Sequence, residues 1–390
     1  MDFEGLPIDV DLSLMELDRM DYEESLYRFL RDGWRWIDPS PFADGWALEA
    51  VAEHLEAVAW GDIKNLIINI PPRMGKSSIT SVAFPAWVWA QRRISPTSGP
   101  SVQFLHASYD QKLSLRDSVK CRRLIDSPWY QSMWGDRFNL VGDQNTKFRF
   151  DNNTNGSRLS TSVGSALTGE GGSIIVVDDP NAAMEAANAA SIEATNEWWD
   201  IALSTRLNDA RTGAFVVIQQ RLGEEDLTGH ILSTNSGNWT HLCLPMRYDP
   251  SRSFTTSIGW SDPRTEDGEL LDPDRFGETQ VKELEIKLGP WASAGQLQQS
   301  PTPRGGGIFK RDWWQLWESP DDSFPPMEYV LVSADTAYTE KETNDPTGCT
   351  VWGLWYDKGA PRVMLMYAWR KHLEMNGVYT PRLPDETNGE

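Results

Sequence analysis

The chain has 390 residues and a net charge of -21, from 57 acidic and 36 basic side chains. This length is enough for two domains. The charge excludes a protein that covers nucleic acid with its whole surface, because acidic side chains repel phosphates. It leaves open contact with DNA through a local basic patch or through a ring of subunits with a basic inner face.

The first residues also bear on location. No apolar run approaches the roughly 18 residues of a membrane span. The start of the chain lacks the basic and apolar regions of a signal peptide. We therefore expect no membrane association and no secretion. The cysteines, Cys121, Cys243 and Cys349, are odd in number and widely spaced, which suits a reducing cytoplasm and gives no metal-binding pattern.

Residues 1–40 are predicted to form an acidic arm with a helix over residues 12–30. A further helix is predicted over residues 46–60, because apolar side chains recur there on one helical face. In many nucleotide motors, a polar or aromatic residue just upstream of the phosphate loop contacts the adenine. Trp46 and His54 are the candidates, although packing in the core is the favoured role for each.

The stretch from Leu66 to Ser77 combines an apolar strand, a tight loop and the start of a helix. Gly75, Lys76 and Ser77 follow the order of a phosphate-binding loop. In such a loop, backbone N–H groups hold the β-phosphate, the lysine reaches the β- and γ-oxygens, and the hydroxyl holds Mg²⁺. Ile70 stands where the usual pattern has its first glycine. The residues predicted to bind ATP are Pro72, Arg73, Met74, Gly75, Lys76, Ser77 and Ser78.

The next segments alternate between strand and helix patterns. A strand is predicted over residues 102–109 and a charged helix over 110–125. Residues 147–150 and 158–163 flank an Asn-Asn-Thr-Asn-Gly turn, which predicts a hairpin.

A second decisive stretch runs from Ser173 to Pro180. Four apolar residues followed by Asp178 and Asp179 predict a buried parallel strand with acids at its carboxyl end. Asp178 is predicted to hold Mg²⁺ beside Ser77, and Asp179 to orient and deprotonate the attacking water. The alternative is a strand end with solvated acids. The phosphate loop about a hundred residues upstream disfavours that alternative.

A helix is predicted over residues 191–207 and another strand over residues 214–221. Gln220, at the end of that strand, is the candidate sensor of the γ-phosphate. Arg73, Arg206 and Arg221 are candidates for stabilising charge in the transition state, in the same subunit or in a neighbour. For any one of them, a structural salt bridge is an equally good assignment.

The C-terminal third contains a different pattern. Residues 246–307 are rich in Pro, Asp and Gly, with one helix over 279–288, and are interpreted as a lid and linker region. Strands are predicted over 328–337, 349–356 and 362–369. The first ends in Asp335. Three antiparallel strands with an acid on the first are how an RNase H-like nuclease begins.

Together these motifs make the chain resemble the large terminase subunit of tailed bacteriophages. The resemblance covers residues 46–374 and includes the motifs at 71–77 and 177–180, Gln220-Arg221-Leu222 and the Asp335 strand. It implies an α/β P-loop ATPase domain over residues 41–245, the lid region, and an RNase H-like domain from residue 308. It also implies an Mg²⁺- and ATP-dependent motor that moves double-stranded viral DNA into a procapsid. The implied partners are a portal protein, a small terminase subunit and further copies of the chain in a ring, within the host cytoplasm.

The nuclease part departs from the family. Such a nuclease needs about three acids around two Mg²⁺ or Mn²⁺ ions. Asp335 and Asp345 are the candidate ligands here, and no full carboxylate cluster is visible, so the domain over residues 308–390 is expected to be truncated and poorly active. The alternatives are a catalytically impaired prophage remnant or assembly protein, and a helicase-type P-loop ATPase. The intact Lys76, Ser77, Asp178 and Asp179 disfavour the former, and the lack of further helicase motifs disfavours the latter.

Overall fold

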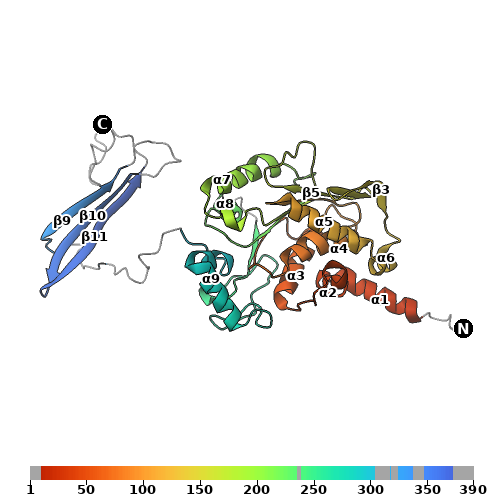
Figure 1. Cartoon of the computed structure of the whole chain (residues 1–390), viewed down its shortest axis with the longest axis horizontal. Coiled ribbons are helices and arrows are strands. Elements are labelled where there is room, and N and C mark those ends of the chain that lie inside the picture. The colour runs from red at the N-terminus through yellow and green to blue at the C-terminus, as the bar shows by residue number, and fades with distance from the viewer. Residues whose placement is uncertain (1–9, 235–238, 304–316, 318–323, 337–346, 372–390) are drawn as a thin grey trace. The chain divides into compact units, whose positions relative to one another are not determined.

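A computed structural model describes residues 10–234, 239–303, 317, 324–336 and 347–371 (Figure 1). Contacts between Cα atoms divide the chain into two compact units, Met1–Ile308 and Phe309–Glu390. Each unit is described by itself. Among the described residues, no helix is both long enough and apolar enough to cross a membrane.

The first unit is built on an eight-stranded sheet in the order β3-β4-β5-β2-β6-β7-β1-β8. The strands from β5 to β8 in this order are parallel, whereas β3, β4 and β5 pair antiparallel at one edge. All residues of β6 are buried, as expected for a parallel strand covered on both faces. The bounds are β1 Asn65–Asn69, β2 Gln103–Ser108, β3 Leu140–Asn145, β4 Arg149–Asn152, β5 Ser157–Ser162, β6 Ile174–Asp178, β7 Ala214–Gln219 and β8 Thr240–Cys243.

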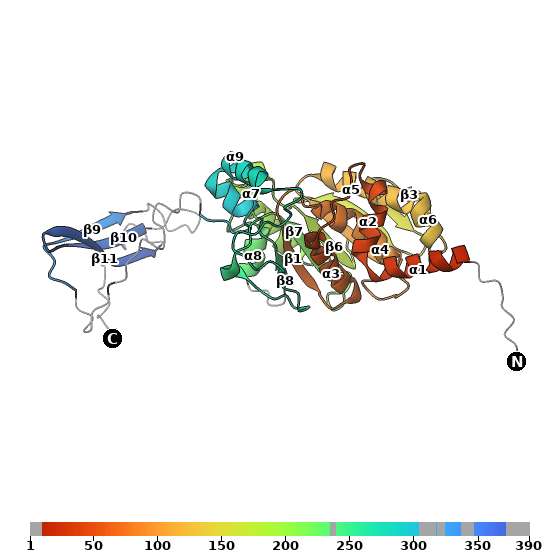
Figure 2. The same cartoon turned by 90° about the horizontal axis from the view of Figure 1, so that it is seen from below.

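Helices cover both faces of this sheet (Figure 2). Alternate residues of β6 point to opposite faces, so Ile174 and Val176 join one hydrophobic core and Ile175 and Val177 the other. The first core is covered by α1 Val10–Glu24, α2 Leu26–Ile37, α3 Trp46–Trp60, the π-helix η1 Ser78–Ala83, α4 Phe84–Trp89, α5 Gln111–Ile125 and α6 Pro128–Trp134. The second is covered by α7 Ala189–Glu197, the π-helix η3 Trp198–Leu203 and α8 Leu227–Ser233. Two short 3-10 turns are η2 Ala183–Glu185 and η4 Pro250–Arg252.

The predicted α/β fold with a mainly parallel sheet is therefore confirmed. Helix α3 spans the predicted residues, and the strands and helices predicted between residues 102 and 125 are present as β2 and α5. The predicted hairpin is present as β4 and β5.

The assignment of residues 1–40 to an arm is wrong for helix α2. Leu26, Phe29 and Leu30 have no exposed surface and belong to the first core. Their spacing of three and four residues places them on one face of the helix. Gly33 allows close packing, because a Cβ there would lie 2.9 Å from a ring carbon of Trp129.

The segment predicted as a lid and linker packs into the first unit. Leu271, Val281 and Leu297 are buried in the first core. The Met246 N–H donates to the Leu297 carbonyl at 2.8 Å. Its helix, α9 Glu278–Gln296, is longer than predicted and is kinked at Gly289, which has a φ of 72° and precedes Pro290.

The second unit contains three antiparallel strands in the order β11-β10-β9, which confirms the three predicted strands. Their bounds are β9 Tyr329–Asp335, β10 Thr347–Asp357 and β11 Ala360–Lys371. Every residue of β9 is exposed, including Leu331 at 64%. The sheet thus leaves apolar side chains in contact with solvent.

Candidate active site

The predicted motor residues gather where three neighbouring strands end. The phosphate loop follows β1, Asp178 closes β6, and Gln220 follows β7. These strands are adjacent and parallel, so their carboxyl ends meet at one edge of the sheet. Ligands of open α/β sheets bind at this edge.

Backbone geometry gives the phosphate loop its shape. Arg73 and Gly75 adopt positive φ angles of 69° and 74°. A Cβ on Gly75 would lie 3.3 Å from Leu48 Cδ2, so this glycine serves both the turn and close packing against α3. The carbonyl of Arg73 accepts a hydrogen bond from Arg275 Nη2 at 2.8 Å, which ties the loop to the 246–307 segment.

Lys76 and Asp179 contact each other directly. Lys76 is buried, and its Nζ lies 2.9 Å from Asp179 Oδ1. Asp179 has a φ of 46° and accepts the Gln220 N–H on the same oxygen at 3.4 Å. The structure therefore brings together the lysine, the proposed base and the proposed sensor.

Asp178 lies beside them in a buried setting. Ser81 Oγ donates to its Oδ2 at 3.0 Å, whereas Oδ1 is buried without a hydrogen-bond partner in the described part of the chain. Burial, and then the charges of Asp179 and Asp117, raise the pKa of Asp178 to about 7. A buried carboxylate oxygen that accepts no hydrogen bond fits a hard cation such as Mg²⁺, which prefers oxygen ligands. Ser77, on the preceding turn, would be the second protein ligand.

Two charged residues near this site, Asp117 and Arg158, were not predicted from the sequence. Asp117 of α5 is buried, pairs with Arg116 at 2.8 Å, and adds negative charge near Asp178. Arg158 of β5 is fully buried, and its Nη2 donates to the Ser81 carbonyl at 2.9 Å. Ser81 is the residue whose hydroxyl donates to Asp178. No sequence signal marks them, because only the fold places α5 and β5, which follows β2 in the sheet, near the end of β6.

A buried polar network lies under Gln220. Asn69 Nδ2 donates to the Gln219 carbonyl at 3.2 Å and to Thr228 Oγ1 at 3.1 Å. Gln219 Nε2 donates to the same hydroxyl at 3.0 Å, and Asn69 Oδ1 lies 2.7 Å from His241 Nε2. Burial, with the nearby Arg221 and Arg252, lowers the pKa of His241 to about 4, so this ring is neutral. The network joins β1, β7, β8 and α8 immediately behind the site.

The three candidate arginines have different surroundings. Arg221 is buried and paired through Nε with Asp226 at 2.9 and 3.0 Å, while its N–H donates to Gln299 Oε1 at 2.9 Å. Arg221 therefore forms a structural salt bridge, which was the alternative to a role in stabilising the transition state. The carbonyl of Arg206 accepts a hydrogen bond from the Gly172 N–H, just before β6. Gly172 and Asp178 lie at opposite ends of this extended segment, roughly 20 Å apart. Arg206 is too distant to act in its own subunit. Arg73 is exposed within the loop itself.

The upstream candidates for contact with adenine differ as well. His54 is fully buried, with Nδ1 2.7 Å from the Ala50 carbonyl and Nε2 2.9 Å from Thr256 Oγ1. This confirms the favoured core role. Trp46 is half-buried and stacks on Trp260 with ring centroids 6.3 Å apart.

Of the two predicted nuclease ligands, the structure describes Asp335 and does not test the pairing with Asp345. Asp335 closes β9 and is exposed, and Asp345 lies outside the described residues. Within the described ranges, no group of three or more His, Cys, Asp or Glu side chains is arranged to hold a metal ion.

Comparisons with known proteins found no matching family model and no match among curated proteins. The solved structures that are similar to the chain include two from large terminases. The large terminase of bacteriophage HK97 is 14% identical over 88% of this chain and 67% of that chain, with a TM-score of 0.42. A mutant ATPase domain of the large terminase of Thermus phage P74-26 is 11% identical over 64% of this chain and 93% of that chain, with a TM-score of 0.40.

Proposed function

We propose that the first unit is a P-loop ATPase. One observation carries this proposal: Lys76, Asp178, Asp179 and Gln220 converge at the carboxyl edge of a parallel sheet, directly after a glycine-containing loop. Residues 72–78 would hold the phosphates, with Mg²⁺ between Ser77 and Asp178. The metal would neutralise charge on the β- and γ-phosphates.

The ion pair between Lys76 and Asp179 supports the proposed roles of both side chains. A bound γ-phosphate would compete with the carboxylate for the Lys76 ammonium. The Asp179 carboxylate would then be released to accept the proton of the attacking water. The Gln220 N–H, which donates to Asp179, would sense that change and pass it to the polar network behind β7.

Paired measurements of nucleotide binding and hydrolysis test these roles. Lys76→Ala is expected to abolish hydrolysis by losing the phosphate contact. Asp179→Asn is expected to keep ATP binding and to lower the turnover rate by about 10²- to 10⁴-fold, the range for loss of a general base. Asp209→Asn, in the loop before β7 and so at the opposite end of that strand, is the matched control. Near-normal turnover in Asp179→Asn would move the base elsewhere.

The arginines are tested by mixing subunits. We propose that Arg206 acts on a neighbouring subunit and that Arg73 is the candidate within its own. Arg206→Ala should bind ATP but hydrolyse it slowly, and addition of Lys76→Ala subunits should restore part of the activity at mixed interfaces. Failure of this rescue would exclude Arg206 as a residue supplied to a neighbour.

We further propose that hydrolysis drives double-stranded viral DNA into a procapsid. The support is the sequence resemblance to large terminases. The partners would be a portal protein, a small terminase subunit and further copies of the chain, on the procapsid in the host cytoplasm. An ATPase assay with and without DNA, followed by displacement of a third strand from a DNA triplex, tests this function. Hydrolysis that neither responds to DNA nor displaces the third strand would contradict translocation.

A further inference from the structure

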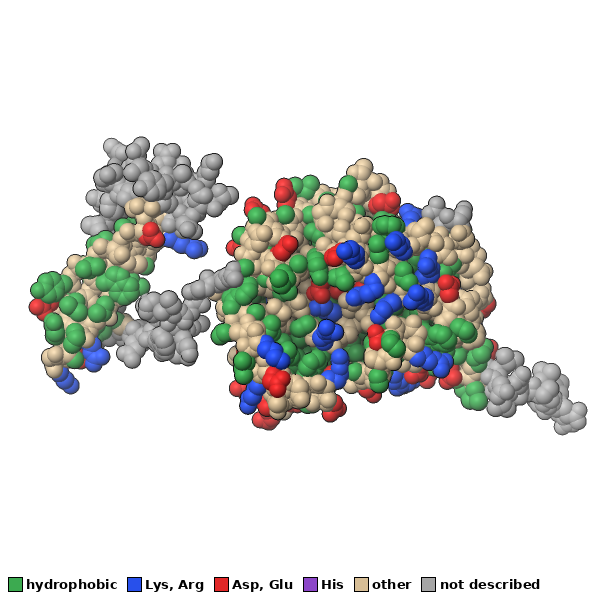
Figure 3. Space-filling view, viewed as in Figure 1, with side chains coloured by type: hydrophobic (Ala, Val, Ile, Leu, Met, Phe, Trp, Pro, Cys, Tyr) green, Lys and Arg blue, Asp and Glu red, His purple; other side chains and the backbone are tan. Residues whose placement is uncertain are grey.

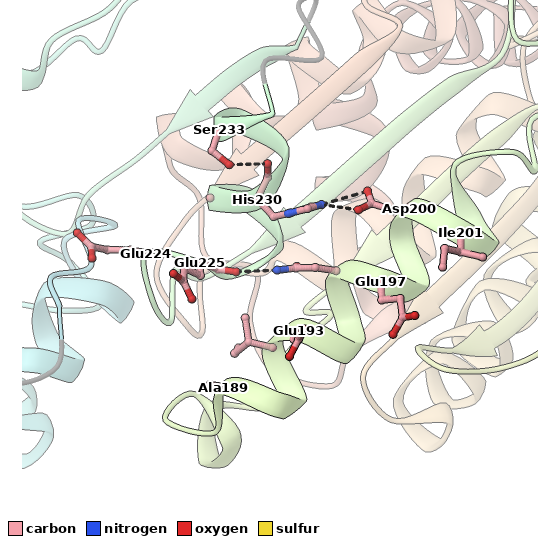
Figure 4. A pocket seen from close by; sticks show the side chains of 12 residues that line it. Ala189, Glu193, Glu197, Asp200, Ile201, Glu224, Glu225, His230 and Ser233 are labelled. Carbon is pink, nitrogen blue, oxygen red and sulfur yellow. Dashed lines mark hydrogen bonds and ion pairs between the residues drawn. The ribbon is translucent and has the colours of Figure 1, made fainter. Parts of the chain in front are cut away.

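An acidic groove lies on the side of the first unit covered by α7, η3 and α8. It has a volume of about 800 Å³ and opens between these helices and the turn at residues 224–225 (Figure 4). Asn196 Nδ2 closes one wall by donating to the Glu225 carbonyl at 2.9 Å. The titratable side chains that line the groove are Glu193, Glu197, Asp200, Glu224, Glu225 and His230.

The groove offers more negative charge than its own residues neutralise. His230 pairs with Asp200 at 2.9 Å, and no Lys or Arg among the described residues lines the groove. Ile192 and Ile201 add an apolar component, and Ile201 is 68% exposed. A complementary partner would therefore present several basic side chains together with apolar carbons, as a basic helix does.

Such a helix is present in the chain itself. Helix α5 carries Lys112, Arg116, Lys120, Arg122 and Arg123 against a single acid, Asp117. Basic side chains gather on the face of the first unit over this helix (Figure 3). In a chain with a net charge of -21, this is an unusual concentration of positive charge. Arg116 and Arg123 are exposed, and Lys120 is partly exposed beside Asp38.

The two surfaces match in spacing and lie on opposite faces of one sheet. Glu193, Glu197 and Asp200 are separated by four and three residues along α7 and η3. Arg116, Lys120 and Arg123 have the same separations along α5. The helices pack against different cores, so a single molecule cannot bring them together. A second copy can present its α5 to this groove.

We propose that α5 of one copy docks into the acidic groove of the next. The contact is head-to-tail, so each copy uses one surface on either side, and repetition generates a ring or a helical array. Helix α5 and the acidic groove are then the surfaces that join neighbouring copies. What the assembled ring does rests on the proposed function. The attraction is electrostatic, so it weakens as ionic strength rises.

A charge-swap experiment tests the contact. One variant carries Lys120→Glu and Arg123→Glu, and the other carries Glu193→Lys and Glu197→Lys. Alone, each places like charges at the contact, and its self-association constant should fall at least about tenfold at low salt. Mixed in equal amounts, the two variants have complementary surfaces at every junction, and association should return. Sedimentation velocity over a range of concentrations measures the association of each variant alone and of their mixture.

Controls separate this contact from catalysis and from DNA binding. Lys282→Glu with Lys287→Glu makes the same change of charge on α9 and should associate like the unaltered chain. Lys76→Ala should also associate normally, so a failure of the ATPase proposal would leave this readout intact. A chain that is monomeric at every concentration, or a mixture that does not recover, would overturn the proposal. Loss of DNA-stimulated hydrolysis in the α5 variant, with its self-association unchanged, would assign α5 to DNA instead.

Discussion

Strands β6 and β9 have similar sequences and different surroundings. Each is a short apolar run that ends in aspartate, at Asp178 and at Asp335. Every residue of β6 is buried between two layers of helices, whereas every residue of β9 is exposed. The carboxylate of Asp178 has acids, a lysine and serines close by, and burial raises its pKa to about 7.

The comparison shows that an aspartate at a strand end becomes a chemical site only through its neighbours. Burial removes water from Asp178, and the fold supplies Lys76 and Ser81 around it. Asp335, by contrast, closes a strand whose residues are all exposed. The same sequence signal therefore supports a motor site in one unit and leaves the nuclease assignment a prediction in the other.

The largest expected effect is on hydrolysis. Asp178→Asn keeps the size of the side chain and removes the charge that would hold the metal. We expect the ATPase rate to fall at least about 100-fold, as for loss of one group that stabilises transition-state charge. The matched change Asp335→Asn should leave the rate unchanged. Steady-state phosphate release measures both, and an equal loss in the two variants would break the contrast between the units.

A second effect, on stability, compares burial in the two strands directly. Ile175→Ala in β6 should lower the free energy of unfolding by about 2–5 kcal/mol, because it leaves a cavity in a closed core. Leu331→Ala in β9 should change it by less than about 0.5 kcal/mol, as for exposed positions. Chemical denaturation followed by tryptophan fluorescence tests both. A cost above about 2 kcal/mol for Leu331→Ala would show that another part of the chain or another copy covers β9.

A third effect is the pH dependence of stability that comes from a buried acid away from the candidate active site. Glu56 of α3 accepts the Leu26 N–H at 2.6 Å, and burial, with Glu53 and Glu49 nearby, raises its pKa to about 7. The folded chain then binds this proton more tightly than the unfolded chain. The free energy of unfolding should therefore fall as pH rises from about 4.5 to about 7, and this contribution levels off above that range.

Glu56→Gln removes that dependence and keeps an acceptor for Leu26. At pH 8 the variant should be more stable than the unaltered chain by on the order of 2–3 kcal/mol, and the difference should vanish near pH 4. Glu193→Gln, an exposed acid on α7, is the control. Denaturant titrations at several pH values measure the difference, and a constant difference across this range would contradict the assignment.

The smallest expected effect is on DNA cleavage. Asp335, even with Asp345, supplies too few carboxylates to position two metal ions across a scissile phosphate. Residues 1–390 should therefore leave plasmid DNA largely intact with Mg²⁺ or Mn²⁺, and Asp335→Ala should change nothing. Robust cleavage that disappears in Asp335→Ala would show that the ligands are completed by residues outside the described ranges, such as Asp345.

The sequence predicted the parts of the fold that depend on local pattern. Apolar runs located β1, β6 and β7, and helical periodicity located α3 and α5. It also predicted that Lys76, Asp178, Asp179 and Gln220 would share one edge, because parallel strands align their ends. Arg158, Asp117 and the network around Asn69 were missed, since single polar residues carry no periodic signal and only tertiary packing brings them together. The predicted helix over residues 12–30 is divided at Ser25 into α1 and α2, and the burial of α2 was missed because its flanking acids obscured a three- and four-residue apolar spacing.

The hydrogen bond from the Arg221 N–H to Gln299 has a mechanical consequence. Gln299 follows directly after α9, whose other half is held by Arg247 through Glu278 and Glu285 at 2.8 Å each. Strand β7 thus ends on a helix that is fastened at two points and jointed at Gly289. Because α9 is kinked at Gly289, a displacement at the end of β7 would move the part of α9 after the kink relative to the part that Arg247 holds, so the kink is the joint between the candidate active site and this segment.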